Sequence, residues 1–146
     1  MRNAEHIANH LDVHFTVIGP VLVTNLPVST TNAEDYSKRE PSSFEFAKIE
    51  SSRVLKLLSK LDVSKATGLD QISNRVFKLA APVIYRQLTE LFNLSLKNGE
   101  YPNDWRLAKV SPVFKAGKRN DPNNYRPLSI LSTISIVFEK LVYEQI

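Results

Sequence analysis

The segment Arg106–Leu131, RLAKVSPVFKAGKRNDPNNYRPLSIL, carries the clearest β-sheet pattern in this chain of 146 residues. Its first part, Arg106–Lys115, alternates apolar and polar residues enough to predict a strand. Tyr125–Leu131 predicts a returning strand, and the proline in each strand marks an edge position or a bulge. Residues 116–124 hold glycine, proline and several Asn and Asp residues, which are typical of turns. The segment therefore predicts a β-hairpin with a long, basic loop.

A strong helix is predicted after the hairpin. From Ile134, apolar residues recur at i, i+3, i+4, i+7 and i+8, and the helix is expected to run to Ile146 without a stop signal. An apolar face that still repeats at the last residue predicts a truncated chain. The core is expected to comprise the helix faces 84–92 and 134–142, together with Leu107, Val110, Val113 and Phe114.

Helices are also predicted before the hairpin. The spacing from Val54 to Leu61 predicts a helix that Ser51-Ser52 caps at its start. A polar loop follows at Ser64–Asp70. A short helix is expected at Asn74–Ala80, and a separate helix is expected from Pro82 to a stop at Asn98-Gly99. The predicted fold class is therefore α+β, with helices packed around an antiparallel hairpin.

The N-terminal third is predicted to contribute little to this fold. Residues 1–18 place apolar side chains on one helical face, and Gly19-Pro20 is expected to end that helix. Residues 24–43 are rich in Ser, Thr, Asn and Pro, which is typical of a linker. We therefore expect a poorly ordered connector at 1–45 and a folded part at 46–146.

Charge is distributed unevenly along the chain. Residues 1–50 hold 4 Lys or Arg and 7 Asp or Glu, a net charge of −3, whereas residues 51–146 hold 15 and 8, a net charge of +7. Six basic residues against one acid between Arg106 and Arg126 suggest a polyanionic partner, but on charge alone a solvated lysine-rich surface is the preferred interpretation. No apolar run is long enough to predict a membrane span or a signal peptide, which favours an intracellular protein.

Residues for catalysis are scarce. There is no cysteine, and His6, His10 and His14 share a helical face that is better explained as a polar surface than as a metal site. No two of the six aspartates are adjacent, so a complete two-metal polymerase or nuclease site is not expected, and we predict neither catalytic nor metal-binding residues. The remaining candidate is the pair Lys115 and Arg126. These residues lie at facing strand ends, where they form either a triphosphate clamp or two ordinary surface charges.

Six sequence blocks follow one another along residues 61–146. They are LDVSKATGLD (61–70), APVI to LFNLSL (81–96), GEYPNDWRLA (99–108), VSPVFK (110–115), DPNNYRPLS (121–129) and FEKLV (138–142). In this order they resemble the start of the reverse transcriptase domain of non-LTR, jockey-like (LINE-type) retrotransposons. Gln71 stands where this family usually has glycine, and HFTVIGP (14–20) resembles the connector that precedes the domain.

The resemblance implies roles for individual residues. Lys115 and Arg126 match residues that hold the triphosphate of the incoming nucleotide. The loop Lys65–Asp70 matches an entry motif that lies along the template, which makes Lys65, Thr67 and Gly68 candidate template-binding residues. Lys118 and Arg119 are expected near nucleic acid on the fingertip loop.

The resemblance also implies what the whole protein does. The chain is expected to be the incomplete fingers portion of a right-hand RNA-directed DNA polymerase, inactive alone because the catalytic aspartates lie downstream. Implied partners are an RNA template, a DNA primer, deoxynucleoside triphosphates and the palm and thumb of the same polyprotein, with Mg²⁺ required by the parent enzyme. The parent would act in the nucleus or in a cytoplasmic ribonucleoprotein. The alternatives are a non-catalytic basic nucleic-acid-binding module and a functionless pseudogene remnant.

Overall fold

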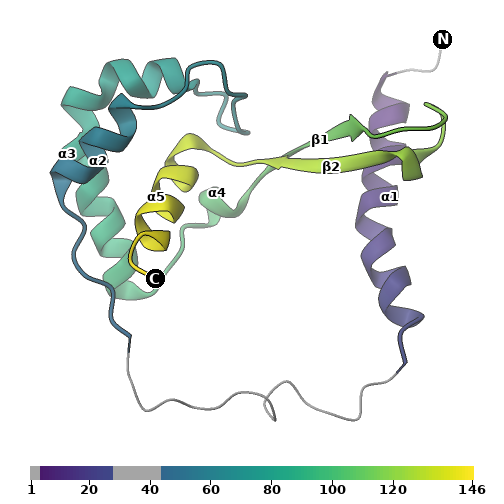
Figure 1. Cartoon of the computed structure of the whole chain (residues 1–146), viewed down its shortest axis with the longest axis horizontal. Coiled ribbons are helices and arrows are strands. Elements are labelled where there is room, and N and C mark those ends of the chain that lie inside the picture. Colours follow the sequence, from purple (N-terminus) through teal and green to yellow (C-terminus); the bar gives the residue numbers. More distant parts are fainter. Residues whose placement is uncertain (1–3, 28–43) are drawn as a thin grey trace. The chain divides into compact units, whose positions relative to one another are not determined.

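The computed structural model describes residues 4–27 and 44–146, and within them the fold is α+β (Figure 1). The chain divides into two compact units: residues 44–111 with 129–146, and residues 1–43 with 112–128. Most of the predicted linker, residues 28–43, lies outside the described residues, so the predicted division at residue 45 stays a prediction.

Two helices lie side by side in the first unit. Helix α2 (Ser51–Ser59) runs along α3 (Asn74–Asn98), as Figure 1 shows. Glu50 occupies the N-cap of α2 without a side-chain hydrogen bond, so the prediction that Ser51-Ser52 caps this helix is wrong. The amide of Asn93 ties the entry of α2 to α3 instead: its Oδ1 accepts from the N–H of Ile49 (2.8 Å) and its Nδ2 donates to the Ile49 carbonyl (3.0 Å).

Helix α3 is continuous, so the prediction of two helices separated before Pro82 is wrong. An interior proline removes one backbone hydrogen bond and costs about 3 kcal/mol. Phe77 and Ala81 before the proline and Phe92 after it are all buried, so one continuous face packs against the core across that position. The predicted stop is confirmed, because Gly99 takes the left-handed conformation (φ 65°) and its N–H donates to the Leu96 carbonyl.

The core of this unit is aromatic at its centre. Phe92 is fully buried; its ring stacks on Phe138 and meets Trp105 edge-on, at centroid distances of 5.2 and 5.6 Å. Trp105 reaches the core from the one-turn helix α4 (Asn103–Arg106), where a strand had been predicted to begin at Arg106. The other buried apolar residues are Ile49, Val54, Leu58, Phe77, Ala81, Val137 and Leu141.

Polar groups line one edge of this core. The hydroxyl of Ser135, which is fully buried, lies 2.7 Å from the Tyr101 hydroxyl and donates to the Trp105 carbonyl (3.1 Å). Tyr101 also donates to Glu139 (3.0 Å). Burial raises the pKa of the Tyr101 phenol above its ordinary value, and the hydrogen bond to Glu139 acts in the same direction.

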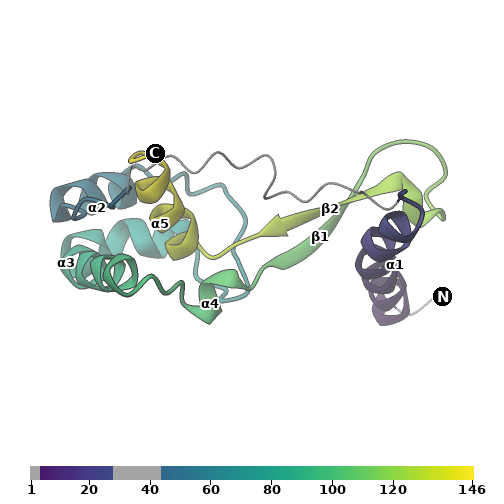
Figure 2. The same cartoon turned by 90° about the horizontal axis from the view of Figure 1, so that it is seen from below.

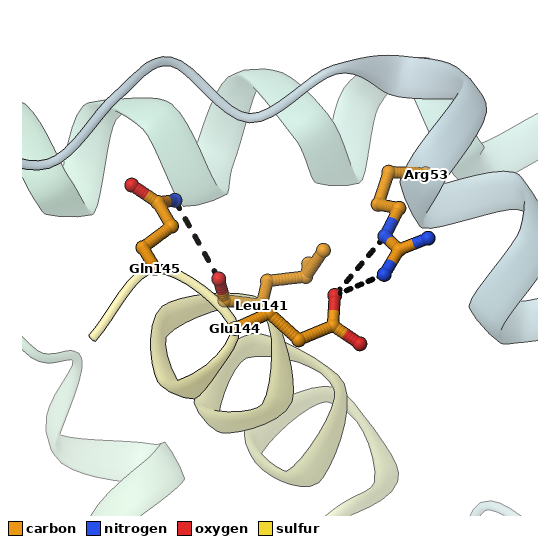
Figure 3. Close-up of polar contacts among 4 residues, drawn as sticks. All are labelled: Arg53, Leu141, Glu144 and Gln145. Carbon is orange, nitrogen blue, oxygen red and sulfur yellow. Dashed lines mark hydrogen bonds and ion pairs between the residues drawn. The ribbon is translucent and has the colours of Figure 1, made fainter.

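Helix α5 (Thr133–Tyr143) closes the unit and lies beside α2 and α3 in both views (Figure 2). It ends at Tyr143, so the prediction that the helix continues to Ile146 is wrong. Just beyond, Arg53 of α2 donates to Glu144 through Nε and Nη2, at 3.0 and 2.7 Å (Figure 3). Since both side chains are partly exposed, this ion pair contributes at most about 1 kcal/mol.

The second unit contains helix α1 and most of the hairpin. Helix α1 (Ala4–Thr24) buries none of its residues, and it continues through Gly19-Pro20, where its end had been predicted. Proline fixes φ at a helical value, so Pro20 removes a hydrogen bond without forcing the helix to stop.

The hairpin consists of β1 (Lys109–Phe114) and β2 (Tyr125–Ile130), joined by a loop with a short 3₁₀ turn at Pro122–Asn124. This confirms the predicted hairpin. The predicted core contribution of its first strand and approach is wrong, because Leu107, Val110 and Val113 are 57, 48 and 47% exposed and Phe114 is only half-buried. A two-stranded ribbon has no second layer of its own to cover these side chains.

Candidate nucleotide and template site

One backbone hydrogen bond and one ring pair set the register of the hairpin. The N–H of Lys115 donates to the Asn124 carbonyl at 2.8 Å. The rings of Phe114 and Tyr125 contact at a centroid distance of 5.4 Å. Phe114 therefore lies opposite Tyr125, with Lys115 opposite Asn124.

This register places Lys115 and Arg126 on the same face of the hairpin. Arg126 lies opposite Val113, two residues before Lys115, and side chains two apart in a strand share a face. The two cations are thus diagonal neighbours, a relation that typically separates Cα atoms by about 7–8 Å. Both are exposed, and in the described part of the chain neither forms an ion pair.

Arg119 does not join this pair. Its guanidinium lies over the Phe114 ring, 4.9 Å from the centroid, and its backbone carbonyl accepts a hydrogen bond from the Tyr125 hydroxyl at 2.9 Å. Phe114 and Tyr125 occupy the face opposite to Lys115 and Arg126, because side chains alternate along a strand. Arg119 therefore packs on the aromatic face of the hairpin, away from the proposed clamp.

Lys118 is the other predicted template residue of the loop. Its side chain is exposed, and its backbone carbonyl accepts from Asn124 Nδ2 at 2.9 Å. The ammonium is therefore available to solvent, while its backbone is part of the turn.

The predicted entry loop lies in the other compact unit and is held by local hydrogen bonds. Asp62 Oδ1 accepts from the Ser64 hydroxyl (2.7 Å) and from its N–H (2.9 Å), and these two bonds lower the pKa of the Asp62 carboxyl. The Asp62 carbonyl accepts from Asn74 Nδ2 (2.8 Å), which joins the loop to α3. The Nζ atom of Lys65 lies 4.0 Å from Oδ2 of Asp62. Because 72% of the Lys65 side chain is exposed, the ammonium is accessible to solvent.

Gly68 is buried, and there is no room for a side chain. A Cβ atom at this position would stand 2.9 Å from the Leu131 carbonyl oxygen and from two backbone atoms of Ser132. The neighbouring Thr67 is half-buried. The structure therefore supplies a packing reason for the glycine, which sequence reasoning had assigned to template contact alone.

Gln71 has a conformation that favours glycine. Its φ is +57°, and its N–H donates to the Gly68 carbonyl at 3.3 Å, closing a turn. This is the position where the resembling family usually has glycine. The chain keeps the left-handed backbone there although it carries a side chain, which costs about 1 kcal/mol or more.

Among residues 4–27 and 44–146, no group of three or more His, Cys, Asp or Glu side chains could hold a metal ion. The same residues form no helix long and apolar enough to cross a membrane. The exposed cations Lys115 and Arg126 of the hairpin can bind and orient anions.

Comparison with known proteins identifies relatives of the whole chain. No protein-family model matches it. It is 27% identical over its full length to the RNA-directed DNA polymerase from mobile element jockey of Drosophila melanogaster, and 28% identical over 97% of its length to that of Drosophila funebris. The probable RNA-directed DNA polymerase from transposon BS of Drosophila melanogaster is 26% identical over 95% of the chain.

The chain is homologous to RNA-directed DNA polymerases of non-LTR retrotransposons. It spans only 15–16% of the length of these polymerases. The resemblance drawn from the sequence blocks is thereby confirmed, whereas the roles predicted for individual residues remain predictions.

Proposed function

We propose that this chain supplies the incoming-nucleotide clamp and part of the template channel of an RNA-directed DNA polymerase. Lys115 and Arg126 bind the triphosphate of a deoxynucleoside triphosphate. The observation that carries the proposal is the hairpin register, which puts both exposed cations on one face as diagonal neighbours. Homology along nearly the whole chain to proteins named RNA-directed DNA polymerases supports it.

The chemistry of the two side chains suits a triphosphate. Arginine presents a planar fork that binds two phosphate oxygens at once, and lysine contributes a compact point charge on a flexible stem. Neither cation is neutralised by a carboxylate among the described residues, so both charges are available to a ligand.

The template contact is proposed for the loop at Lys65–Gly68 and for Lys118. Lys65 and Lys118 are exposed cations that would neutralise backbone phosphates, while Thr67 and Gly68 would shape the loop that carries Lys65. Arg119, also predicted to bind template, has the additional contact with the Phe114 ring.

The remaining partners belong to the longer relatives. The RNA template, the DNA primer and the palm and thumb of the same polyprotein are proposed because those relatives are named RNA-directed DNA polymerases. Mg²⁺ is proposed only for that longer enzyme, because the described residues of this chain do not fit a metal site. The chain would therefore position substrate rather than catalyse its transfer.

The test is nucleotide binding by the full chain. dTTP is titrated into wild type, Lys115→Gln and Arg126→Gln, and amide chemical shifts report the affinity. Each substitution is expected to weaken binding about fivefold, which corresponds to about 1 kcal/mol for an exposed charge contact. Arg126→Lys keeps the charge but loses the fork, so it should weaken binding measurably as well.

Lys109→Gln is the matched control. Lys109 begins β1 and Lys115 directly follows it, six residues further on, which is about 20 Å along an extended chain. A clamp predicts nearly unchanged dTTP affinity in this control. Equal losses for Lys109→Gln and Lys115→Gln would contradict the clamp. They would indicate a basic surface that binds polyanions regardless of how its charges are arranged.

A further inference from the structure

The turn of the hairpin is held together by Asn124. Its backbone carbonyl accepts from the N–H of Lys115 at 2.8 Å, and its own N–H donates to the Asp121 carbonyl at 3.1 Å. Its side-chain Nδ2 donates to the Lys118 carbonyl at 2.9 Å. Asn124 thus forms hydrogen bonds with the backbone at Lys115, Asp121 and Lys118, and Lys115 is one of the two proposed clamp residues.

The side chain of Asn124 also packs over Gly117. Gly117 has φ +92°, a conformation that side chains rarely adopt. A Cβ there would stand 2.7–2.9 Å from the three terminal atoms of the Asn124 amide. The bare glycine backbone therefore provides the space in which the amide sits, so the loop is built around this side chain.

The opposite face of the hairpin is fastened independently. The Tyr125 hydroxyl donates to the Arg119 carbonyl, and the Arg119 guanidinium covers the Phe114 ring. These contacts hold the aromatic face, whereas Asn124, at the end of the 3₁₀ turn, is joined to Lys115 by a backbone hydrogen bond and directly precedes β2. The hydrogen bonds of Asn124 are therefore the contacts that join Lys115 and the loop at Lys118 to the start of β2.

We infer that Asn124 is a positioning residue that orients Lys115 relative to Arg126 for binding a triphosphate. The inference rests on the proposed clamp. Its physical basis is preorganisation: a turn held in one conformation presents two cations at a set spacing, so less conformational entropy is lost when both bind the same ligand. Asn124 lies opposite Lys115 and two residues before Arg126, so it is adjacent to both.

The experiment compares two anions. Inorganic tripolyphosphate is long enough to engage two cations, whereas inorganic phosphate needs one. Both are titrated into the full chain by amide chemical shifts. Asn124→Ala is expected to weaken tripolyphosphate binding about fivefold while changing phosphate binding less than about twofold, because the charges remain and only their mutual orientation is lost.

Asn123→Ala is the matched control. The exposed side chain of Asn123 also makes one hydrogen bond within the loop, Nδ2 to Asp121 Oδ1 at 2.9 Å, but it does not bond to Lys118. This variant should bind both anions as wild type does. Asn124→Leu keeps roughly the size of the side chain, loses the N–H donor and adds no charge, so it should reproduce the selective loss expected for Asn124→Ala.

The outcomes separate this inference from the proposed clamp. If Lys115→Gln loses tripolyphosphate affinity but Asn124→Ala does not, the positioning role is wrong and the clamp stands. If wild type does not prefer tripolyphosphate over phosphate, the clamp itself fails. If Asn124→Ala or Asn124→Leu abolishes the nuclear Overhauser contacts between the Phe114 and Tyr125 rings, then Asn124 builds the hairpin rather than orienting the clamp, and the inference is overturned.

Discussion

Replacing Gly68 by alanine tests how the entry loop is seated. The added methyl would stand 2.9 Å from the Leu131 carbonyl oxygen, the Ser132 N and the Ser132 Cα. All three are backbone atoms, so no side-chain rotation can relieve the contact. They also lie at the start of α5, where the Ser132 hydroxyl accepts from the Ser135 N–H and caps the helix.

The expected loss follows from this geometry. Ordinary van der Waals contacts of a Cβ begin at 3.4 Å, so the loop or the entry of α5 must move by several tenths of an ångström. Overpacking of this kind typically costs about 1–3 kcal/mol. That is a large part of the roughly 5–15 kcal/mol that stabilises a typical domain, so the change is measurable.

The assay is urea denaturation followed by tryptophan fluorescence. Trp105 is the only tryptophan and is buried against Phe92 and Phe138, so its emission reports the unit that contains Gly68. Gly68→Ala should lower the free energy of unfolding by about 1–3 kcal/mol without changing the slope of the transition.

Two variants serve as controls. Lys65→Ala removes an exposed side chain from the same loop and should change stability by less than about 0.5 kcal/mol. Gly99→Ala strains a positive φ but meets no atom within 4 Å, and should cost about 1 kcal/mol from backbone conformation alone. Wild-type stability in Gly68→Ala would refute the close approach between this loop and the start of α5.

Three further predictions concern the same unit. Gln71→Gly should raise stability by about 0.5–1 kcal/mol in the same assay, because relief of a left-handed residue exceeds the added flexibility of the unfolded chain; a loss would show that the side chain contributes more than its strain. Phe92→Ala removes a fully buried ring that packs against two others and should cost about 3–5 kcal/mol, so a cost below about 1 kcal/mol would contradict the aromatic core. Because the pKa of Tyr101 is raised in the folded state, the unfolded chain loses this proton first as pH rises above the ordinary value of 10.0, and stability should fall there. Tyr101→Phe should show a smaller alkaline loss than wild type between pH 9 and about 11 when the two denaturation series are compared.

The candidate site was predictable to the extent that it depends on local pattern. Alternation and turn composition predicted strands at Arg106–Lys115 and Tyr125–Leu131, and the structure contains them as Lys109–Phe114 and Tyr125–Ile130. That Lys115 and Arg126 share a face needed the register, which one hydrogen bond to Asn124 sets. Arg119 illustrates the limit: its charge suggested a nucleic-acid contact, whereas its position over the Phe114 ring depends on how the loop folds back.

In the fold, too, local patterns were predicted correctly, whereas features that depend on tertiary packing were not. Helical periodicity predicted the face of α5 correctly, because a residue's side of a helix depends only on its spacing. The predicted helix break at Pro82 is wrong because local propensity takes no account of the core contacts that residues on both sides of the proline make. Leu107, Val110 and Val113 looked like core residues in the sequence but are about half exposed, because burial needs a partner surface.

The sequence by itself determined the α+β class, the hairpin, the last helix, the basic C-terminal two thirds and the pair of cations at the strand ends. Tertiary structure alone decided which apolar faces are buried, why Gly68 has no side chain, and that Asn124 organises the turn. The physical reason is the separation along the chain over which each kind of interaction acts. Periodicity, capping and turn chemistry act over a few neighbouring residues, whereas close packing and loop closure join atoms that are distant in the chain, such as Gly68 and Ser132.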